Sequence, residues 1–525
     1  MFATARRARS PGVLAYPFPG AAGVLARVEA AFDRCFGAHA NPWRHLGALG
    51  FHLFWIVVVS GVYLYVVFDT SVAGAWQSVQ ALSTEQPWAG GLMRSLHRYA
   101  SAAFAAVILL HVGCEFVRGR YAGARWFTWI SGVPLVWLAL GSGVVGYWLV
   151  WDQLALFSAV ATMEWLDAAG VFGVSLARNF LTPESVDDRL FSLFVFLHIG
   201  LPLLLLLGMW VHIKRLSRPE TVPARALGAG TLAALLVLSL FAPVTSAGPA
   251  DAMRAEPALA LDWFYLAPHA LMYETSPGAL WAVATVLTLA LAACPLLGRA
   301  HRPAVARVDP ANCNGCRRCF EDCPHGAITM HPHPDARIGA ELAVVDPALC
   351  TACGICAGAC PSSTPFRSVR ELVTGIDMPQ QRIGALRETL QSELARLSGP
   401  ARIVVLGCSN SVEVEALRSP DTAALTFMCA GQMPPSFVEF ALRNGAHGVV
   451  VATCPEDGCA YRLGGRWTQQ RLDGLREPYL RARVPREQMR VVACAPHEAA
   501  DLRRAVEALR TRRSHASAAE EVVHG

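Results

Sequence analysis

Charged residues are scarce in this 525-residue chain: they make up 16% of it, against 54% hydrophobic residues. That balance argues against an ordinary soluble protein and favours a membrane protein with a soluble part. The net charge of +5 is modest, and basic residues gather at segment ends rather than in one stripe, so we expect no nucleic-acid partner. We also expect no secretory signal peptide, because no short apolar run with a small-residue cleavage site follows the basic start MFATARRARS.

Cysteine is nearly absent from the first 300 residues, which hold only Cys35, Cys114 and Cys294. The other thirteen cysteines lie between positions 313 and 494. Their clustering at two- and three-residue intervals indicates metal ligands rather than disulfides. It also predicts that this half of the chain lies in a reducing compartment, most simply the cytoplasm.

Six apolar segments reach the length of about 20 residues that a membrane-spanning helix needs. We place them near 48–68, 93–117, 129–151, 190–213, 226–246 and 278–297. Basic residues concentrate in the N-terminal arm and in the loops 118–128 and 214–225, whereas the other three loops hold very few. The positive-inside rule therefore predicts that both termini and the cysteine-rich half lie in the cytoplasm. The expected location is a bacterial inner (cytoplasmic) membrane.

Composition divides the chain further. We expect a six-helix membrane domain over 1–305, a ferredoxin-like α+β domain over 306–366, a linker helix in 367–400, a small α/β domain over 401–513 and a disordered tail over 514–525. The linker helix is predicted from isoleucine and leucine at helical spacing. The α/β domain is predicted from apolar strands such as RIVVLG and GVVVAT, which alternate with helical stretches.

Four histidines in two of the apolar segments have a matched spacing. His97 and His111 are fourteen positions apart, and so are His198 and His212. Fourteen residues of α-helix advance about 21 Å and close nearly four turns, so both histidines of a helix face the same way. Two antiparallel helices of this kind can hold two iron ions between imidazoles. His97 would then pair with His198 near the outer face, and His111 with His212 near the cytoplasm.

Glycines in two other segments repeat the interval. Gly47 and Gly61 are fourteen apart, and so are Gly132 and Gly146. Glycine permits the close backbone approach that a large planar ring needs. A lone membrane histidine can also bond a neighbouring helix or line a cavity. Four histidines at one spacing, with two matching glycine pairs, favour two bis-histidine haems.

The region from about 41 to 290 resembles the cytochrome b family of bc-type quinol-oxidising complexes. The resemblance rests on HVGCEFVRGRY after His111, on TWISG at 128–132 and on GYWLVWDQLA at 146–155. It implies two b-type haems, contact between Arg94 and an outer-haem propionate, and a homodimer within a larger complex. The chain departs from the family at Val150 and Asp152, where the family has proline and glycine. It also lacks the family's last two helices and any Rieske-type cysteine–histidine pair.

The segment LDWFYL at 261–266 is similar to the Pro-Glu-Trp-Tyr element of that family, whose glutamate takes a proton from quinol. The resemblance implies that Asp262, with Tyr265 beside it, belongs to a quinone site at the outer face. An acid held among aromatic residues at a membrane interface could accept or donate a proton. The other interpretation is a helix-capping aspartate in an ordinary aromatic belt.

Two cysteine runs, CNGCRRCFEDCP from Cys313 and CTACGICAGACP from Cys350, fit C-x2-C-x2-C-x3-C-P. This is the signature of a two-cluster bacterial ferredoxin, in which the fourth cysteine of each run ligates the other cluster. The first 4Fe–4S set is therefore Cys313, Cys316, Cys319 and Cys360, and the second set is Cys350, Cys353, Cys356 and Cys323. A zinc site is the alternative, which two complete runs disfavour.

A third set of cysteines, near the ends of apolar strands, comprises Cys408, Cys429, Cys454 and Cys459. Strand ends converge at one edge of an α/β sheet, so these four thiolates could meet there. Residues 401–511, above all FMCAGQMPPSFVEFALRNGAHGVVVATCPEDGCAYRLGG, resemble the delta subunit of methyl-viologen-reducing hydrogenase, an iron–sulfur adaptor. The resemblance implies a 2Fe–2S cluster on the third set, with Ser411 at a position where the family usually has cysteine. A cysteine-rich domain without a cluster is the alternative.

These centres suggest a path for electrons between a cytoplasmic flavoprotein and quinone in the lipid membrane. The flavoprotein would be heterodisulfide-reductase A-like, as the delta-subunit resemblance implies, or linked to NAD(P)H or ferredoxin. The direction of flow stays open: quinol oxidation at the outer face builds the membrane potential, and quinone reduction there dissipates it. One rival hypothesis is a membrane anchor and relay without a quinone site. The other, a transporter with regulatory clusters, is disfavoured because the sequence shows no intramembrane charge pair or broken-helix repeat.

Overall fold

The structure is a computed structural model that describes residues 19–37, 40–122, 125–180, 186–214, 216, 219–254, 258–262, 264–297, 304–455, 459–496 and 498–524. The chain forms two compact units. The helical unit comprises Tyr16–Lys214 and Pro219–Ala300, and the cysteine-rich unit consists mainly of His301–Gly525.

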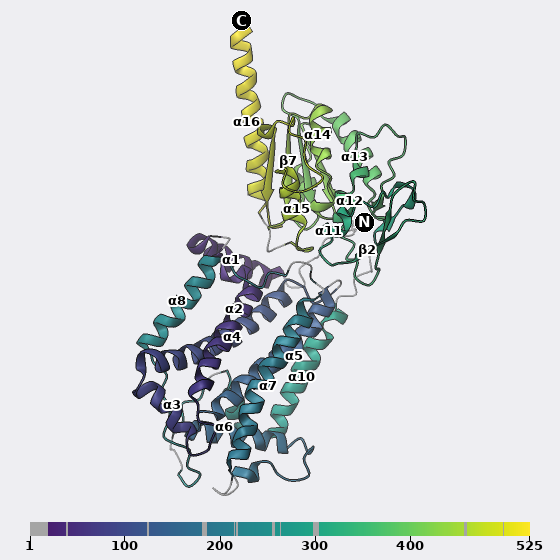
Figure 1. The fold of residues 1–525 in the computed structure, drawn as a ribbon. Helices are drawn as coiled ribbons and strands as arrows, with labels where there is room; N and C mark the ends of the chain where they lie inside the picture. The colour runs from purple at the N-terminus through teal and green to yellow at the C-terminus, as the bar shows by residue number, and fades with distance from the viewer. Residues whose placement is uncertain are drawn as a thin grey trace, which may run out of the picture. The chain divides into compact units, whose positions relative to one another are not determined.

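The helical unit is built from ten α-helices within the described residues. They are α1 (Pro19–Phe36), α2 (Leu46–Val67), α3 (Ala75–Thr84), α4 (Leu92–Val117), α5 (Trp126–Trp148), α6 (Gln153–Asp167), α7 (Asp188–Ile213), α8 (Arg225–Phe241), α9 (Ala267–Glu274) and α10 (Pro277–Leu297). Short helical turns lie at Pro42–Arg44 (η2), Pro87–Gly91 (η3) and Ala177–Phe180 (η5). Figure 1 shows α2 beside α4 and α5 beside α7, with α10 along α5.

Five helical segments are long and apolar enough to cross a membrane, by length and composition. They are Leu46–Val67, Pro87–Val117, Trp126–Trp148, Asp188–Ile213 and Pro277–Leu297, and they match five of the six predicted spans. The sixth, α8, has 17 residues, or about 26 Å of helix. It ends before the predicted position 246 because Pro243 disfavours helical backbone at Ala242. A count of six spanning helices is therefore not confirmed.

Two of the apolar clusters of this unit join its central helices. One joins α2, α4, α5, α7 and α8 and includes Leu53, Phe104 and Leu205. The other joins α5, α6 and α7 and includes Trp148 and Phe194. Large apolar side chains elsewhere on the helices are exposed, as the bilayer-facing surface of a membrane protein requires.

The first part of the cysteine-rich unit contains short elements between its cysteine runs. They are β1 (Arg307–Val308), α11 (Arg318–Asp322), β2 (Ile328–Pro332), β3 (Glu341–Val345), α12 (Ile355–Ala359) and β4 (Ile376–Asp377), with turns η7 (Pro310–Asn312) and η8 (Pro361–Ser363). Strands β2 and β3 form an antiparallel hairpin that pairs Ile328 with Val345, and β1 pairs antiparallel with β4. The linker helix α13 (Ile383–Arg396) follows.

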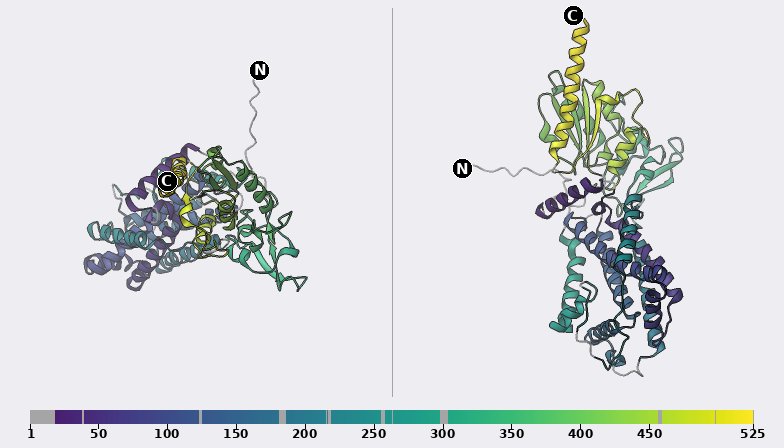
Figure 2. Two further views of the ribbon diagram at one scale, coloured as in Figure 1. Left: turned by 90° about the horizontal axis from the view of Figure 1, so that it is seen from above. Right: turned by 90° about the vertical axis from the view of Figure 1, so that its left-hand side faces the viewer.

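The second part is a parallel sheet covered by helices on both faces. Its elements are β5 (Ile403–Cys408), β6 (Thr422–Phe427), α14 (Ser436–Arg443), β7 (Gly448–Thr453), α15 (Gly464–Leu472), β8 (Met489–Ala493) and α16 (Ala499–His524), with turns η9 (Val414–Leu417), η10 (Ala430–Gln432) and η11 (Arg486–Gln488). The strand order is β6-β5-β7-β8. Helices α13 and α14 pack on one face and α16 on the other, as Figure 2 shows for α16.

Helix α16 continues to His524, which differs from the disordered tail expected over 514–525. Its first half packs on the sheet through Leu502, Val506 and Leu509. Extending a helix that is already nucleated costs little, and the alanine, arginine and glutamate that follow favour helix. The polar residues that suggested a disordered tail therefore form the last part of this helix.

Candidate metal centres

His97 on α4 and His198 on α7 face each other. Their ring centroids are 6.3 Å apart, and the ring planes meet at 69°. Imidazole nitrogens bind a metal ion at about 2.0 Å, so two rings on opposite sides of one ion have centroids roughly 6 Å apart. The Nδ1 atoms of His97 and His198 lie 3.1 Å from the carbonyl oxygens of Val57 and Ser142, respectively. With Nδ1 hydrogen-bonded in this way, each ring presents Nε2 as the ligand atom.

His111 and His212 form the second pair, nearer the other ends of α4 and α7. The two rings are close enough to interact electrostatically. The Nδ1 atom of His212 lies 3.2 Å from Oγ of Ser131. This contact orients the ring as the carbonyl contacts orient the first pair. The residues present therefore fit a metal ion between each pair of imidazoles.

Each predicted glycine, on α2 or α5, lies against one of these histidines. The pairs are Gly47 with His111, Gly61 with His97, Gly132 with His212, and Gly146 with His198. The contact is tightest at Gly146, where an added Cβ would lie 2.8 Å from Cε1 of His198. The glycines thus let the imidazoles lie directly against the neighbouring helix backbone.

Arg94 is buried one turn before His97 on α4. Its guanidinium donates to Oγ of Ser83 at 2.8 Å and to Oγ of Ser246 at 2.6 Å. These two hydroxyls use two of the five guanidinium N–H donors. The position, at the His97 end of the helix, is compatible with the propionate contact that the resemblance implies.

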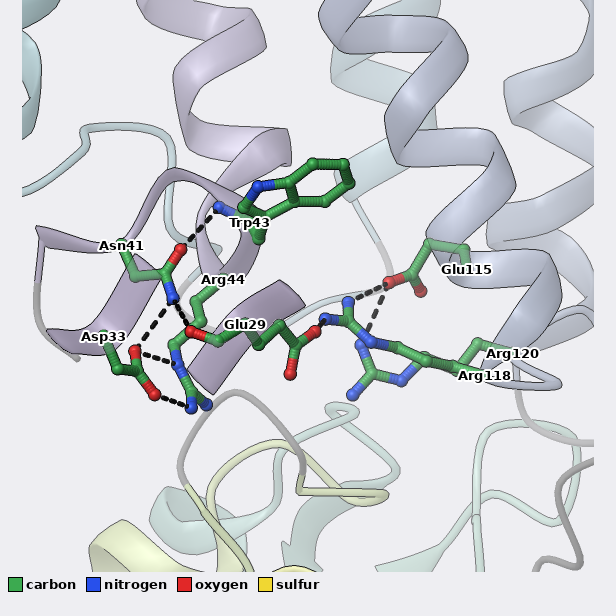
Figure 3. Close-up of polar contacts among 8 residues, drawn as sticks. All are labelled: Glu29, Asp33, Asn41, Trp43, Arg44, Glu115, Arg118 and Arg120. Carbon is green, nitrogen blue, oxygen red and sulfur yellow. Dashed lines mark hydrogen bonds and ion pairs between the residues drawn. The ribbon is translucent and has the colours of Figure 1, made fainter. Parts of the chain in front are cut away.

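An ion-pair network lies at the His111 end of α4 (Figure 3). Arg120 Nη1 donates to Glu115 Oε1 at 2.9 Å, and Arg118 pairs with both Glu115 and Glu29 of α1. Farther along α1, Asp33 pairs with Arg44 of η2, which precedes α2. The network ties α1 to the beginning of α2 and the end of α4.

Asp262 is engaged through both carboxylate oxygens. Its Oδ1 accepts from the backbone N–H groups of Phe264 at 2.9 Å and Tyr265 at 2.7 Å. Its Oδ2 forms an ion pair with Arg98 of α4 and accepts from the Tyr147 hydroxyl at 3.1 Å. Burial opposes the charged form, but the two amides and Arg98 outweigh it, so the pKa of Asp262 is lowered.

Tyr265 is buried beside this group, and its hydroxyl donates to the Ser101 carbonyl at 2.8 Å. Trp263, from the same segment, lies outside the described residues. The sequence pattern did not reveal that Arg98 in α4 pairs with Asp262, which lies outside the spanning helices. The available signal was an arginine inside an apolar segment. Its partner is 164 positions away, so spacing along one helix could not reveal it.

The structure brings the first and second cysteine sets together around two separate cavities. Cys313, Cys316, Cys319 and Cys360 line one cavity, and Cys323, Cys350, Cys353 and Cys356 line the other. In each cavity, three cysteines come from one run and the fourth from the other run. Four sulfurs around a small cavity fit a multi-atom iron–sulfur cluster.

The two runs also share a backbone conformation. The third and fifth residues of each run have positive φ angles: Gly315 (70°), Arg317 (62°), Ala352 (57°) and Gly354 (76°). Such alternation turns successive N–H groups to one side and forms a concavity that favours negative charge. Burial raises the pKa of Cys353 to about 12. A thiolate at that position therefore needs nearby positive charge, which iron would supply.

The third cysteine set gathers at the carboxyl end of the parallel sheet. Its members Cys408, Cys429, Cys454 and Cys459 form one buried cluster. The Sγ atoms of Cys408 and Cys454 are 3.3 Å apart, and thiol contacts link each of these two to a further member. Within the described residues, no group of three or more His, Cys, Asp or Glu side chains has the geometry needed to hold a single metal ion. Four mutually contacting buried thiols nevertheless form a ligand set of the right chemistry for iron.

Ser411 and Cys494 are not members of the buried thiol cluster that the third set forms. The Ser411 hydroxyl donates to the Cys408 carbonyl at 2.9 Å, so it supports the backbone that carries a thiol. Cys494 is buried in the apolar cluster beneath α16. Both contacts indicate structural roles for these two side chains.

Family comparisons match three parts of the chain in order. Residues 32–219 match cytochrome b/b6/petB, residues 312–364 match the 4Fe-4S dicluster domain, and residues 403–512 match the methyl-viologen-reducing hydrogenase, delta subunit. The predicted order of the three regions is confirmed. A solved chain described as "Hyperthermophilic respiratory Complex III" is 20% identical over 52% of this chain and 81% of that chain, with a TM-score of 0.40.

The family matches and the apolar helices together establish the general class of the protein. It is a membrane electron-transfer subunit that combines a region similar to cytochrome b with regions similar to iron–sulfur domains, and its cofactors include haem and an iron–sulfur cluster.

Proposed function

We propose that this chain carries electrons between a cytoplasmic flavoprotein and the quinone pool, as the membrane subunit of a larger redox complex. The main supporting observation is the facing pair His97 and His198, with Nδ1 bonded and Nε2 left for a metal ion. The second histidine pair and the three cysteine sets extend the path. The partner would be heterodisulfide-reductase A-like or NAD(P)H-linked, and the likeness of 403–512 to a hydrogenase delta subunit supports that class.

In this proposal, each histidine pair holds one b-type haem, which supplies reversible one-electron chemistry when bound. Arg94 neutralises a propionate at the outer haem. The first and second cysteine sets each hold a 4Fe–4S cluster, and the third set holds a 2Fe–2S cluster. The proposed domains are the predicted 1–305, 306–366, 367–400 and 401–513. We further propose that both termini and the cysteine-rich unit lie in the cytoplasm, and that the complex contains two copies of the chain.

The proposed quinone site lies around Asp262 and Tyr265, with Arg98 and Tyr147 as further members. Asp262 is ionised at neutral pH because its pKa is lowered. If a quinol hydroxyl displaced Arg98 from Oδ2, the carboxylate would lose its counter-charge while it stayed buried. Its proton affinity would then rise, and it could accept the quinol proton.

A second candidate function is an electron relay with no quinone site. The observation that favours it is the saturation of Asp262, whose two oxygens already accept from two amides, Arg98 and Tyr147. Such an aspartate can be explained as a structural cap for the turn before α9.

An anaerobic difference spectrum separates the two functions. A quinol analogue is added to the purified protein, and dithionite follows. We expect the quinol to reduce a b-type haem band and Asp262→Asn to slow this at least about a hundredfold, the lower end of the usual range for loss of a proton-transfer group. Asp251→Asn, in the same loop between α8 and α9, is the matched control and should reduce at the normal rate.

If only dithionite reduces the haems, a redox titration decides the question. Haem potentials within reach of the quinol would then support the relay and reject the quinone site.

A further inference from the structure

The ferredoxin-like part and the parallel-sheet part of the cysteine-rich unit meet almost backbone to backbone. An added Cβ on Gly358 of α12 would lie 2.2 Å from the carbonyl oxygen of Gly431 in η10. An added Cβ on Gly431 would lie 2.8 Å from Cγ1 of Ile355. Helix α12 carries Cys356 of the second set, and η10 begins directly after Cys429 of the third set. These glycines therefore bring the second and third sets close together.

One buried cluster contains a cysteine from each of these two sets. Cys353 and Cys429 share it with Ile355, Leu463 and Trp467, and Tyr461 packs against it. Tyr461 interacts electrostatically with Cys353 and with three members of the third set. Among the described residues of this cluster, there is no cysteine of the first set.

The first set meets the second set elsewhere. Cys319 and Cys356 belong to one buried cluster on the ferredoxin-like side, and they interact electrostatically. The contacts thus run from the third set to the second and from the second to the first.

A buried ion pair fastens the junction beside Cys323. Asp322 pairs with Arg471 and Arg476 of the parallel-sheet part, and Asp322 and Arg471 are 3% and 0% exposed. The Asp322 carbonyl also accepts from Trp467 Nε1 at 3.2 Å, and the Arg476 guanidinium lies 3.5 Å from the centre of the Trp467 ring. Removing one partner of a buried ion pair leaves an uncompensated charge, so this contact resists separation.

We infer that a cluster held by the third set would exchange electrons with the cluster held by the second set and not directly with the one held by the first, and that Asp322 positions the two cysteine sets for this exchange. In each transfer, one electron would leave one cluster, which is oxidised, and enter the other, which is reduced. No bond forms or breaks. A cluster on the second set would therefore be the intermediate between the clusters on the third and first sets. This inference rests on the proposed cofactor content, and it goes beyond it by giving the order of the cysteine sets.

Electron paramagnetic resonance of the full-length reduced protein tests the order. Magnetic coupling between two reduced centres falls steeply with distance, so it reports which centres are neighbours. The variants are Cys350→Ser, which removes a second-set ligand, and Cys316→Ser, its counterpart in the first set. We expect the third-set signal to be split or fast-relaxing in the parent and in Cys316→Ser, and to lose this coupling in Cys350→Ser.

Coupling that survives Cys350→Ser and disappears in Cys316→Ser would overturn the inferred order, as would a fully reduced parent with no coupling. The measurement uses neither quinone nor flavoprotein, so failure of quinol oxidation leaves it unaffected. A protein with no third-set iron signal would reject both the order and the proposed cofactor content.

The positioning role of Asp322 has a separate test. Asp322→Asn should weaken the coupling while the iron content stays normal, which a merely structural role would not predict. If this variant does not assemble, Arg476→Gln keeps the buried Arg471 pair and should give a smaller change of the same sign. Glu477→Gln, whose partner Arg318 lies at the surface of the same junction, is the control. Unchanged coupling in the first two variants would reject the positioning role.

Discussion

The absence of a side chain at Gly146 leaves room for the imidazole ring of His198. An added Cβ there would lie 2.8 Å from Cε1 of His198, so Gly146→Ala must push the imidazole out of line with His97. Because a bis-histidine site needs both rings in place, we expect bound haem to fall from the proposed two to about one per chain. Haem extracted as the pyridine complex, per mole of protein, measures this.

Gly141→Ala is the matched control for this prediction. Gly141 lies on the same helix α5, and its added Cβ would meet Cδ1 of Leu201 at an ordinary 3.9 Å. That variant should keep both haems. Equal haem content in the two variants would show that the glycine contact does not govern the site.

The residues found from sequence are those whose partners follow from a short-range rule. The four histidines and four glycines repeat at fourteen positions, and the ferredoxin cysteines follow a fixed run, so one helix or loop already encodes their grouping. Arg98 and Tyr147 follow no such rule. They meet Asp262 only because distant helices pack together, and Arg98 is 164 positions from it.

Among the elements, α6 depends on a residue that departs from the cytochrome b pattern. Asp152 caps α6, since its Oδ1 accepts from the Ala155 amide at 2.9 Å. Its Oδ2 accepts from the Ala247 amide, also at 2.9 Å, and so ties the loop after α8 to the helix. The side chain is buried. The departure at position 152 is thus explained by a structural cap.

Asp152→Ala should destabilise the helical unit by about 2 kcal/mol, because it removes a cap and a second, part-buried hydrogen bond. Asp187→Ala is the comparison: it removes an exposed cap of α7, which bonds only the Leu190 amide at 2.8 Å, and should cost about 1 kcal/mol. Loss of the visible haem spectrum with rising temperature measures both. Equal shifts in the two variants would contradict a tying role for Oδ2.

Element boundaries were harder to predict than element types. The strands of the parallel sheet follow the apolar runs closely, because strands buried on both faces need continuous apolar residues. The end of α8 and the extent of α16 were missed, since one depends on Pro243 and the other on packing of the first half of α16 itself against the sheet. The glycine contacts between α12 and η10 were also out of reach, because they join two separately recognisable domains.

At the scale of the whole molecule, the predicted orientation in the membrane can be tested through α1. The network of Figure 3 ties α1 to the His111 end of α4, which the positive-inside rule places in the cytoplasm. Cys35, on α1, is exposed. Val171, in the loop after α6, is also exposed. Helix α6 follows the end of α5 at which Gly146 contacts His198, so this loop lies at the His198 end of the helices. The two positions should therefore lie on opposite sides of the membrane.

A membrane-impermeant maleimide should label Cys35 only in inside-out vesicles. In the double variant Cys35→Ser and Val171→Cys, the same reagent should label the new cysteine only in right-side-out vesicles. Cys114 and Cys294 are buried, and the Cys35→Ser parent corrects for labelling of the cysteine-rich unit. The reverse pattern would move the histidine pairs to the opposite faces. Electrons taken from quinol near Asp262 would then flow outward instead of inward, so this topology decides the sign of any membrane potential that the electron path builds.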